Sequence, residues 1–281
     1  MRLTVRGVTY RVETVGHGPP LLLLHGFTGS RTTWYPFAAK WAAHFRLIMV
    51  DLLGHGESDA PADPQRYAVE ESAADLSALL DRLAIDSAHV LGYSMGGRLA
   101  VSVAALYPDR LRSLVLESSS PGLADPEARR NRKELDDALA EGIEEKGIPA
   151  FVQRWETIPL FASQRQLPCE VKERQRAERL RNRPEGLANS LRGMGTGVQP
   201  SWWTHLSSFS FPVLLITGEW DEKFCRIAES MAKQLPRAEH RVVPRVGHAV
   251  HLEQPDLFGT MVMDFLQGLD VSSANEGGWS Q

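Results

Sequence analysis

The chain has 281 residues, of which 43% are hydrophobic and 23% are charged, and its formal net charge at pH 7 is −4. This length and composition are typical of a globular protein with one large α/β domain and an insertion, or with two modest domains. The slightly acidic balance, with Lys and Arg spread along the sequence, argues against a nucleic-acid-binding surface.

The start of the chain carries no targeting signal that we can identify. Residues 1–16 alternate polar and apolar side chains and lack the apolar core of a signal peptide, so we expect a cytoplasmic protein. The Leu run at 21–24 is too short to span a bilayer, so we expect no membrane partner. Cys169 and Cys225 lie far apart with no C-x-x-C motif, which predicts two free thiols and no metal site.

Eight short runs predict strands. Residues 2–7 and 8–16 alternate with period two and predict an opening hairpin. The later runs are continuously apolar, which is typical of strands buried on both faces of a parallel sheet. These later runs are residues 19–26, 45–51, 88–93, 110–119, 211–218 and 239–244.

Helical patterns separate most of these runs. They cover Trp34–His44, Glu70–Leu83, Met95–Leu106, Glu222–Leu235 and Pro255–Leu266. Regular alternation of strands and helices predicts an α/β fold, with a mostly parallel eight-stranded sheet and helices on both faces.

The alternation stops between residues 121 and 205. This segment is rich in Arg, Glu, Ala and Leu and has no strand-like run, so it predicts a helical insertion. Residues 1–120 and 206–270 would then form the α/β core. The polar, Gly-rich residues 271–281 predict a disordered tail.

The string GYSMG at 92–96 carries the first chemical signal. It is a G-x-S-x-G motif with a predicted strand before it and a predicted helix after it, which is the context of a nucleophile elbow. Side chains at 92 and 96 would collide in so tight a turn. Ser94 would lie at a helix N-terminus, where unpaired N–H groups favour developing negative charge.

A serine hydroxyl needs a base, and the base needs an acid to fix its tautomer. His248 follows the last predicted strand, and we prefer it to His251, which falls where the next helix starts. Asp221 lies just past another buried strand, and we prefer it to its neighbours Glu219 and Glu222. The order Ser94, Asp221, His248 is the one expected for a nucleophile elbow of this type.

An oxyanion hole would complete this arrangement. The backbone N–H of Met95 is one natural donor, and the loop HGF at 25–27 offers a second donor at Phe27. We interpret His25 and His55 as structural residues of their loops.

These motifs together resemble the α/β-hydrolase family. The strings HGFTGS, VDLLGHGES, GYSMGG, GEWD and VGHAVHLEQP occur in the order usual for that family. The resemblance covers the whole chain, implies the α/β-hydrolase fold, and makes residues 121–205 the cap. It does not fix the reaction, because the fold hosts many activities. Dehalogenases and epoxide hydrolases would carry Asp in place of Ser94 and are set aside.

Arg98 is unexpected in an otherwise small and apolar helix. It lies four residues after Ser94, hence on the same helix face as the nucleophile. A buried guanidinium must meet water, an acid or an anionic ligand. The alternatives are a salt bridge to a distant carboxylate or a contact with a carboxylate of the substrate.

A resemblance to a narrower family favours the second alternative, a contact between Arg98 and a carboxylate of the substrate. GYSMGGR, LESSSPGL, WETIPLF, LRNRPEGLANSLRGMGTGVQPS, GEWDEKF and GHAVHLEQP together are similar to the family of 2-succinyl-6-hydroxy-2,4-cyclohexadiene-1-carboxylate synthases, lyases of menaquinone biosynthesis. The resemblance implies a small-molecule substrate with three carboxylates. The family arginines that receive these carboxylates match Arg98, Arg132 and Arg181, and Tyr93 and Trp155 would line the pocket.

The resemblance implies proton abstraction rather than acyl transfer, with no metal and no organic cofactor. Arg132 is flanked by Arg129 and Arg130, and without the resemblance the cap arginines would be read as solvated helix faces. A carboxylesterase or a carbon–carbon bond hydrolase acting on a carboxylate-bearing substrate is the alternative enzyme, and a ligand-sensing protein that retains the triad is the alternative outside enzymes. We expect a monomer or a weak homo-oligomer.

Overall fold

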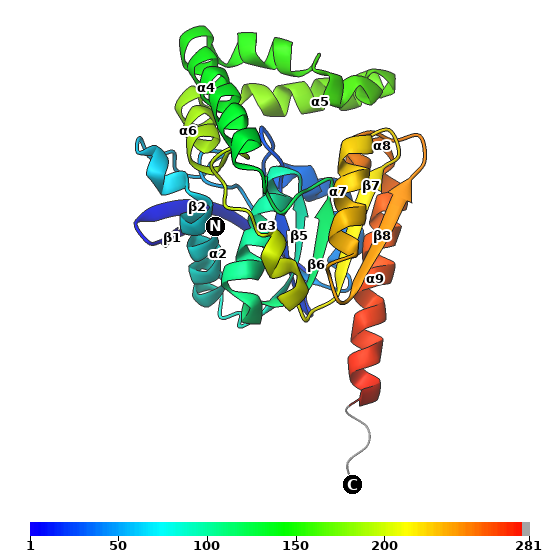
Figure 1. The fold of residues 1–281 in the computed structure, drawn as a ribbon. Coiled ribbons are helices and arrows are strands. Elements are labelled where there is room, and N and C mark those ends of the chain that lie inside the picture. The colour runs from blue at the N-terminus through cyan, green and yellow to red at the C-terminus, as the bar shows by residue number, and fades with distance from the viewer. Residues whose placement is uncertain (277–281) are drawn as a thin grey trace.

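An eight-stranded sheet forms the centre of the protein, whose computed structural model describes residues 1–276 (Figure 1). The strand order is β1-β2-β4-β3-β5-β6-β7-β8. The strands are β1 Arg2–Val5, β2 Val8–Val15, β3 Pro20–Leu24, β4 Arg46–Val50, β5 Ala88–Tyr93, β6 Leu111–Glu117, β7 Val213–Gly218 and β8 Ala238–Val243. β2 pairs antiparallel with β1 and β4, and every other pairing is parallel. The predicted hairpin and mostly parallel sheet are confirmed.

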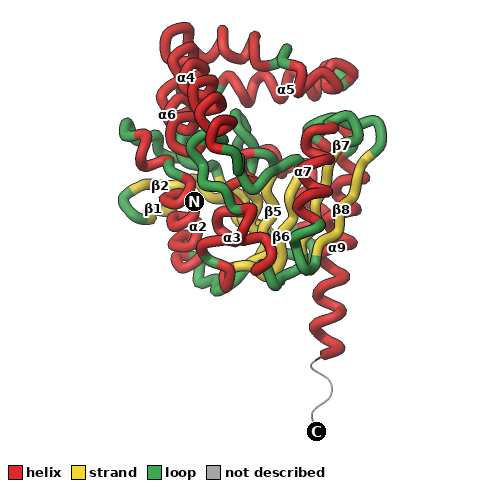
Figure 2. The backbone as a smooth tube through the Cα atoms, viewed as in Figure 1, coloured by secondary structure: helices red, strands yellow, loops and turns green. Residues whose placement is uncertain are grey.

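Helices cover both faces of the sheet (Figure 2). The helices are α1 Tyr35–Trp41, α2 Val69–Arg82, α3 Met95–Leu106, α4 Pro126–Trp155, α5 Cys169–Leu180, α6 Pro184–Met194, α7 Glu222–Ala232, α8 Val250–Glu253 and α9 Pro255–Glu276. Because side chains alternate along a strand, Leu22 and Leu24 of β3 pack with the cluster that includes α2, α3 and α7. Leu21 and Leu23 pack on the other face, with α1 and α9. This two-sided burial explains the continuous apolar runs in the sequence.

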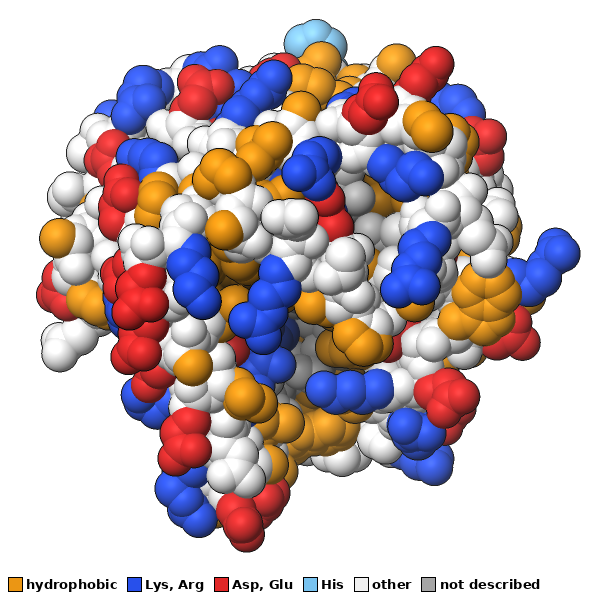
Figure 3. Space-filling view, turned by 90° about the horizontal axis from the view of Figure 1, so that it is seen from above, with side chains coloured by type: hydrophobic (Ala, Val, Ile, Leu, Met, Phe, Trp, Pro, Cys, Tyr) orange, Lys and Arg blue, Asp and Glu red, His pale blue; other side chains and the backbone are white. Residues whose placement is uncertain are grey.

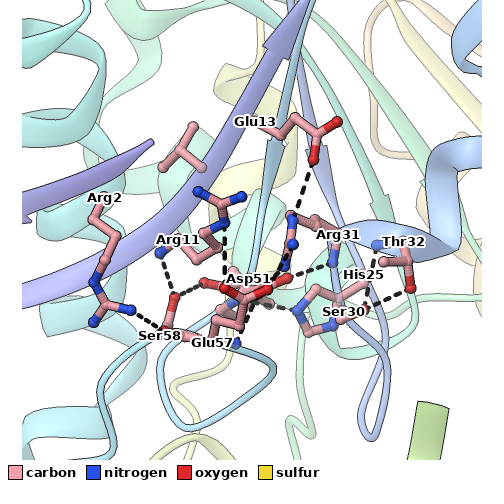
Figure 4. Close-up of polar contacts among 12 residues, drawn as sticks. Arg2, Arg11, Glu13, His25, Ser30, Arg31, Thr32, Asp51, Glu57 and Ser58 are labelled. Atoms are coloured by element: carbon pink, nitrogen blue, oxygen red, sulfur yellow. Dashed lines mark hydrogen bonds and ion pairs between the residues drawn. The ribbon is translucent and has the colours of Figure 1, made fainter. Parts of the chain in front are cut away.

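A buried ion pair holds the loops that follow β3 and β4 (Figure 4). Asp51, directly after β4, is fully buried and accepts hydrogen bonds from the Arg31 backbone N–H and guanidinium, both at 2.7 Å. The Glu57 N–H donates to the same carboxylate at 2.8 Å. Since Arg31 follows the loop after β3, this cluster holds the loops after β3 and β4 together.

Helices α4, α5 and α6 lie between β6 and β7 in the sequence and above the carboxyl edge of the sheet in space (Figure 1). α4 bends at Gly147, where φ is 75°, and Pro149 follows. The cap has an apolar cluster of its own between α4 and α6, which includes Ile143 and Leu187. Glu178 of α5 joins the cap to the core, since its Oε1 accepts hydrogen bonds from Ser30 at 2.6 Å and Thr32 at 2.9 Å.

The C-terminal helix differs from the expectation of a tail that starts at 271. α9 continues through residues 271–276, a stretch that contains neither Gly nor Pro. The remainder of that predicted tail, 277–281, lies outside the described residues. Cys169 and Cys225 are free thiols, as predicted. Among residues 1–276, no helix is both long and apolar enough to cross a membrane.

Candidate active site

Ser94 lies at a strained turn between β5 and α3. Its backbone angles are φ 50° and ψ −107°, a conformation that residues other than Gly rarely adopt. A Cβ on Gly92 would collide with the Gly96 backbone, and one on Gly96 would collide with the Leu24 carbonyl. The two glycines of the motif therefore allow the turn, which places Ser94 at the N-terminus of α3.

The structure brings Ser94, His248 and Asp221 together. His248 Nε2 lies 3.0 Å from Ser94 Oγ, and His248 Nδ1 lies 2.6 Å from Asp221 Oδ2. His248 and Asp221 are buried, with 1% and 7% of their surfaces exposed. Because Asp221 accepts the proton on Nδ1, Nε2 is left free to accept the hydroxyl proton of Ser94. The arrangement is that of a serine activated by a general base.

The rival residues weighed from the sequence have other partners. Glu219 accepts a hydrogen bond from the Arg245 N–H at 2.8 Å. Glu222 is exposed and pairs with Arg226 at 3.5 Å. His251 is held by Glu117, and does not contact Ser94 in any hydrogen bond of the described part of the chain.

The residues that carry the two expected oxyanion donors, Met95 and Phe27, line the same cavity as Ser94. Met95 is the first residue of α3, so its N–H has no partner inside the helix. Phe27 lines the same cavity as Ser94 and Met95. The adjacent His25 is structural, since its Nδ1 donates to Gly26 O at 2.8 Å and its Nε2 accepts from Leu52 N–H at 3.0 Å. Burial lowers the pKa of His25 to about 4, so it is neutral at pH 7.

A cavity of about 660 Å³ opens in front of Ser94 and His248, between the core and the cap. Its wall is largely apolar, with a few cationic groups. The cationic lining residues are Arg98, Arg132 and Lys223. Seen from the cap side, Lys and Arg side chains also surround hollows in the surface (Figure 3). The volume suits a small organic ligand.

Arg98 faces this cavity and is bound only to neutral groups. Its guanidinium donates to Met194 O at 2.8 Å and to Gln199 Oε1 at 2.6 Å. Burial lowers the pKa of Arg98 to about 10, so the guanidinium stays charged at pH 7. No carboxylate in the described residues accepts a hydrogen bond from it. A positive charge therefore remains available beside the nucleophile.

Arg132 is the member of the three neighbouring arginines that lines the cavity. It forms an ion pair with Asp136, one turn later on α4, at 2.8 Å. Arg129 bonds to the Val198 carbonyl at 3.4 Å, and Arg130 is exposed. Asp136 pairs directly with Arg132, and its negative charge also acts on Arg98, which forms no ion pair with it.

Trp155 and Tyr93 line the cavity as the sequence predicts, but Arg181 does not. Arg181 caps the C-terminus of α5 with an exposed side chain and lines a second cavity of about 610 Å³. Phe27, Tyr93 and Phe161 line both cavities. Arg181 therefore lines the adjoining cavity rather than the one in front of Ser94, and its role in substrate binding stays a prediction. The buried arginine of α5 is Arg179, whose guanidinium lies over the Phe161 ring.

Several residues of the site were missed by sequence reasoning. Gln199, the partner of Arg98, is separated from it by 101 residues and lies in the string LRNRPEGLANSLRGMGTGVQPS, but it was given no role. Lys223 lies in the string GEWDEKF but was given no role. The spacing of Arg132 and Asp136, one helical turn, was a usable signal for their pairing. Within the described residues, no group of His, Cys, Asp or Glu side chains is arranged to hold a metal ion.

The elbow, the order of the triad residues and the sheet topology define one class of protein. The family model described as alpha/beta hydrolase fold matches residues 19–255. The chain belongs to the alpha/beta hydrolase fold family.

Known relatives narrow the comparison. A Bacillus subtilis (strain 168) protein that provisionally bears the name 2-succinyl-6-hydroxy-2,4-cyclohexadiene-1-carboxylate synthase is 48% identical over 265 residues, which are 94% of this chain and 96% of that protein. The structure of MenH from S. aureus is similar with a TM-score of 0.89 and 35% identity, over 93% of this chain and 98% of that chain. A malate-bound esterase from Thermogutta terrifontis has a TM-score of 0.81 and 30% identity, over 96% and 99%. The predicted resemblance to the synthase family is confirmed.

Proposed function

We propose that the protein is a carbon–oxygen lyase of menaquinone biosynthesis. It eliminates pyruvate from 2-succinyl-5-enolpyruvyl-6-hydroxy-3-cyclohexene-1-carboxylate to give 2-succinyl-6-hydroxy-2,4-cyclohexadiene-1-carboxylate. The B. subtilis relative, 48% identical over almost the whole chain, supports this assignment. The observation that carries it is Arg98, a charged side chain bound to neutral partners in the cavity of Ser94.

The reaction begins with proton abstraction. His248, oriented by Asp221, accepts the Ser94 hydroxyl proton, and the Ser94 oxygen removes the ring proton next to the succinyl carbonyl. The electrons of that C–H bond form a new ring double bond, and the existing double bond shifts by one position. The C–O bond to the enolpyruvyl group breaks, and enolpyruvate takes up a proton to become pyruvate.

Negative charge develops on the succinyl carbonyl oxygen during this step. The N–H groups of Phe27 and Met95 are our proposed donors to that oxygen, and losing one donor of this kind typically costs about a hundred- to a thousand-fold in rate. Arg98 and Arg132 would bind substrate carboxylates, with Tyr93 and Trp155 forming apolar walls. Arg181 lines the second cavity, which shares Phe27, Tyr93 and Phe161 with the first, and we keep it as the proposed partner of a third substrate carboxylate.

The experiment couples pyruvate release to lactate dehydrogenase, with the enolpyruvyl substrate made freshly by the enzyme that precedes this step. Ser94→Ala and p-nitrophenyl acetate serve as controls. Rapid pyruvate release that is lost in Ser94→Ala, with slow ester cleavage, supports the lyase. Background pyruvate release would overturn it.

Ester hydrolysis is the second candidate, because a serine with a His–Asp pair and two backbone donors is also suited to acyl transfer. The similarity to the esterase whose structure holds malate, a small dicarboxylate, favours a carboxylate-bearing ester. Brisk p-nitrophenyl acetate cleavage without pyruvate release would favour this candidate.

We place the protein in the cytoplasm, acting on a small molecule without nucleic-acid or membrane partners, and as a monomer or a weak homo-oligomer. No metal and no organic cofactor enters the proposed reaction, in which Ser94 and His248 remove the ring proton. The negatively charged carboxylates of the substrate bind arginine side chains.

A further inference from the structure

Glu117 is a buried acid that the proposed reaction does not use. It is the last residue of β6 and is fully buried. Its backbone carbonyl accepts a hydrogen bond from the Ser94 N–H at 2.9 Å. One main-chain contact thus ties the end of β6 to the strained residue of the nucleophile elbow.

The Glu117 carboxylate holds a different segment. Its Oε1 accepts a hydrogen bond from the His251 backbone N–H at 2.9 Å, and both carboxylate oxygens lie 2.9 Å from His251 Nδ1. A buried carboxylate is costly unless donors satisfy it, and two donors of His251 do so here. His251 lies in α8, three residues after His248, so Glu117 also fixes the loop of the catalytic base.

The His251 ring also packs against Tyr93, a residue of the active site. Its centroid lies 4.6 Å from that of Tyr93 in an edge-to-face contact, and Tyr93 lies 5.5 Å from the His248 ring. Trp34 and Phe258 enclose His251 on other sides, with centroids at 5.7 and 6.0 Å. His251 is thereby held against the residue that precedes Ser94.

We propose that Glu117 and His251 form a second carboxylate–imidazole pair that positions the first. Through its carbonyl and its carboxylate, Glu117 sets the separation of Ser94 from His248, which must stay within hydrogen-bond reach for proton transfer. Glu117 and His251 are positioning residues, since neither touches Ser94 Oγ or His248 through a side-chain hydrogen bond among residues 1–276. Small displacements of reacting groups can cost about a hundred-fold in rate.

The test measures how fast Ser94 is labelled by a fluorophosphonate, followed by intact mass. Labelling requires only a serine that is activated by its base, so it does not depend on which substrate the enzyme uses. The positioning role rests on the proposed function only where pyruvate release is measured. Failure of the wild-type protein to release pyruvate would therefore overturn the lyase and leave this inference standing or falling by the labelling rate.

Glu117→Ala should slow labelling by about 10- to 100-fold, and Glu117→Gln, which keeps an acceptor for the His251 N–H, by less than about tenfold. In pyruvate release, kcat should fall while KM changes little, because substrate-binding groups are untouched. Should Glu117→Ala not fold, His251→Ala carries the same test, with an expected slowing of about tenfold or more. Wild-type labelling by the folded variant would overturn the proposal.

Ser113→Ala is the matched control. Ser113 lies on the same strand and also holds a buried imidazole, His89, at 2.7 Å from Nδ1, but away from Ser94. The Ser113→Ala variant should have a lower melting temperature than the wild type and an unchanged rate of Ser94 labelling. Equal slowing in Ser113→Ala and Glu117→Ala would mean general destabilisation and would overturn the positioning role.

Discussion

Arg98 donates a 2.6 Å hydrogen bond to the side-chain oxygen of Gln199, a neutral amide that forms no ion pair with the guanidinium. Gln199 is itself buried, with 1% of its surface exposed. The pair holds the guanidinium in a fixed orientation beside the cavity of Ser94 without neutralising it. A charged guanidinium held in a fixed orientation at this point can donate two parallel hydrogen bonds to a carboxylate of the substrate.

Arg98→Ala should lower kcat/KM for pyruvate release by about ten- to a thousand-fold, because a contact to a substrate carboxylate worth a few kcal/mol is lost. Arg98→Lys should recover only part of the lost kcat/KM, since an ammonium group keeps the charge but cannot donate two parallel hydrogen bonds to a carboxylate. Steady-state kinetics measures both variants. Arg110→Ala, which removes an ion pair with Asp81 far from the cavity, is the control. Unchanged kinetics in Arg98→Ala would contradict the assignment.

Asp221→Asn should lower kcat by about ten-thousand-fold with little change in KM, because an amide can donate to His248 Nδ1 and so favour the wrong tautomer. The 2.6 Å contact between Asp221 Oδ2 and His248 Nδ1 is the basis for this expectation. Rapid-mixing measurement of pyruvate release gives kcat. Glu222→Gln, one residue further on, is the control and should behave like the wild type. A mild effect of Asp221→Asn would exclude Asp221 as the orienting acid.

Asp51→Ala should lower the free energy of unfolding by about 3–5 kcal/mol, since it leaves the buried Arg31 guanidinium without its only fully buried carboxylate partner among the described residues. Two backbone N–H groups, of Arg31 and Glu57, would also lose their acceptor. Denaturant unfolding followed by far-UV circular dichroism measures the change. Arg2, whose ion pair with Asp59 is exposed, offers the control: Arg2→Ala should cost less than about 1 kcal/mol. Equal losses in the two variants would refute the importance of the buried pair.

Stability should fall as the solution is acidified, because two buried histidines are neutral in the folded state. Burial lowers the pKa of His25 to about 4 and that of His55 to about 3, whereas both pKa values lie near 6.5 in the unfolded chain. Below about pH 6.5 the unfolded chain therefore binds protons that the folded protein does not, and the free energy of unfolding decreases until the folded pKa values are reached. Each histidine contributes up to about 1.4 kcal/mol per pH unit.

His55→Asn tests this dependence, because an amide can still donate to Leu53 O but does not titrate. Unfolding by denaturant at about pH 7 and about pH 5 should show a smaller pH dependence for the variant than for the wild type. Identical pH dependence in the two proteins would mean that His55 is not buried as a neutral base.

Much of the architecture follows from local pattern. The apolar runs lie on strands because burial on both faces leaves no polar position, as the packing of Leu21 and Leu22 on opposite faces illustrates. Ser94, Asp221 and His248 could be proposed because each directly follows a strand or its loop, at the edge where the strands of a parallel sheet end. The spacing of the glycines around Ser94 encodes the turn itself.

Tertiary pairings could not be predicted in the same way. The bond between Glu117 and His251 joins residues 134 apart, and no short motif records it. Arg181 was placed by resemblance to a family motif, but the orientation of α5 depends on Glu178 binding Ser30 and Thr32, which the sequence does not reveal. Such contacts are decided by how separately formed elements pack.

In the proposed reaction, Ser94 acts as a base and not as a nucleophile. The most direct test compares single-turnover pyruvate release from the unlabelled substrate and from substrate carrying deuterium at the ring carbon that bears the succinyl group, with the intact mass of the protein recorded during turnover. We predict that deuterium slows pyruvate release and that the protein mass stays unmodified. An unchanged rate together with a covalent adduct on Ser94 would contradict the account and indicate acyl transfer.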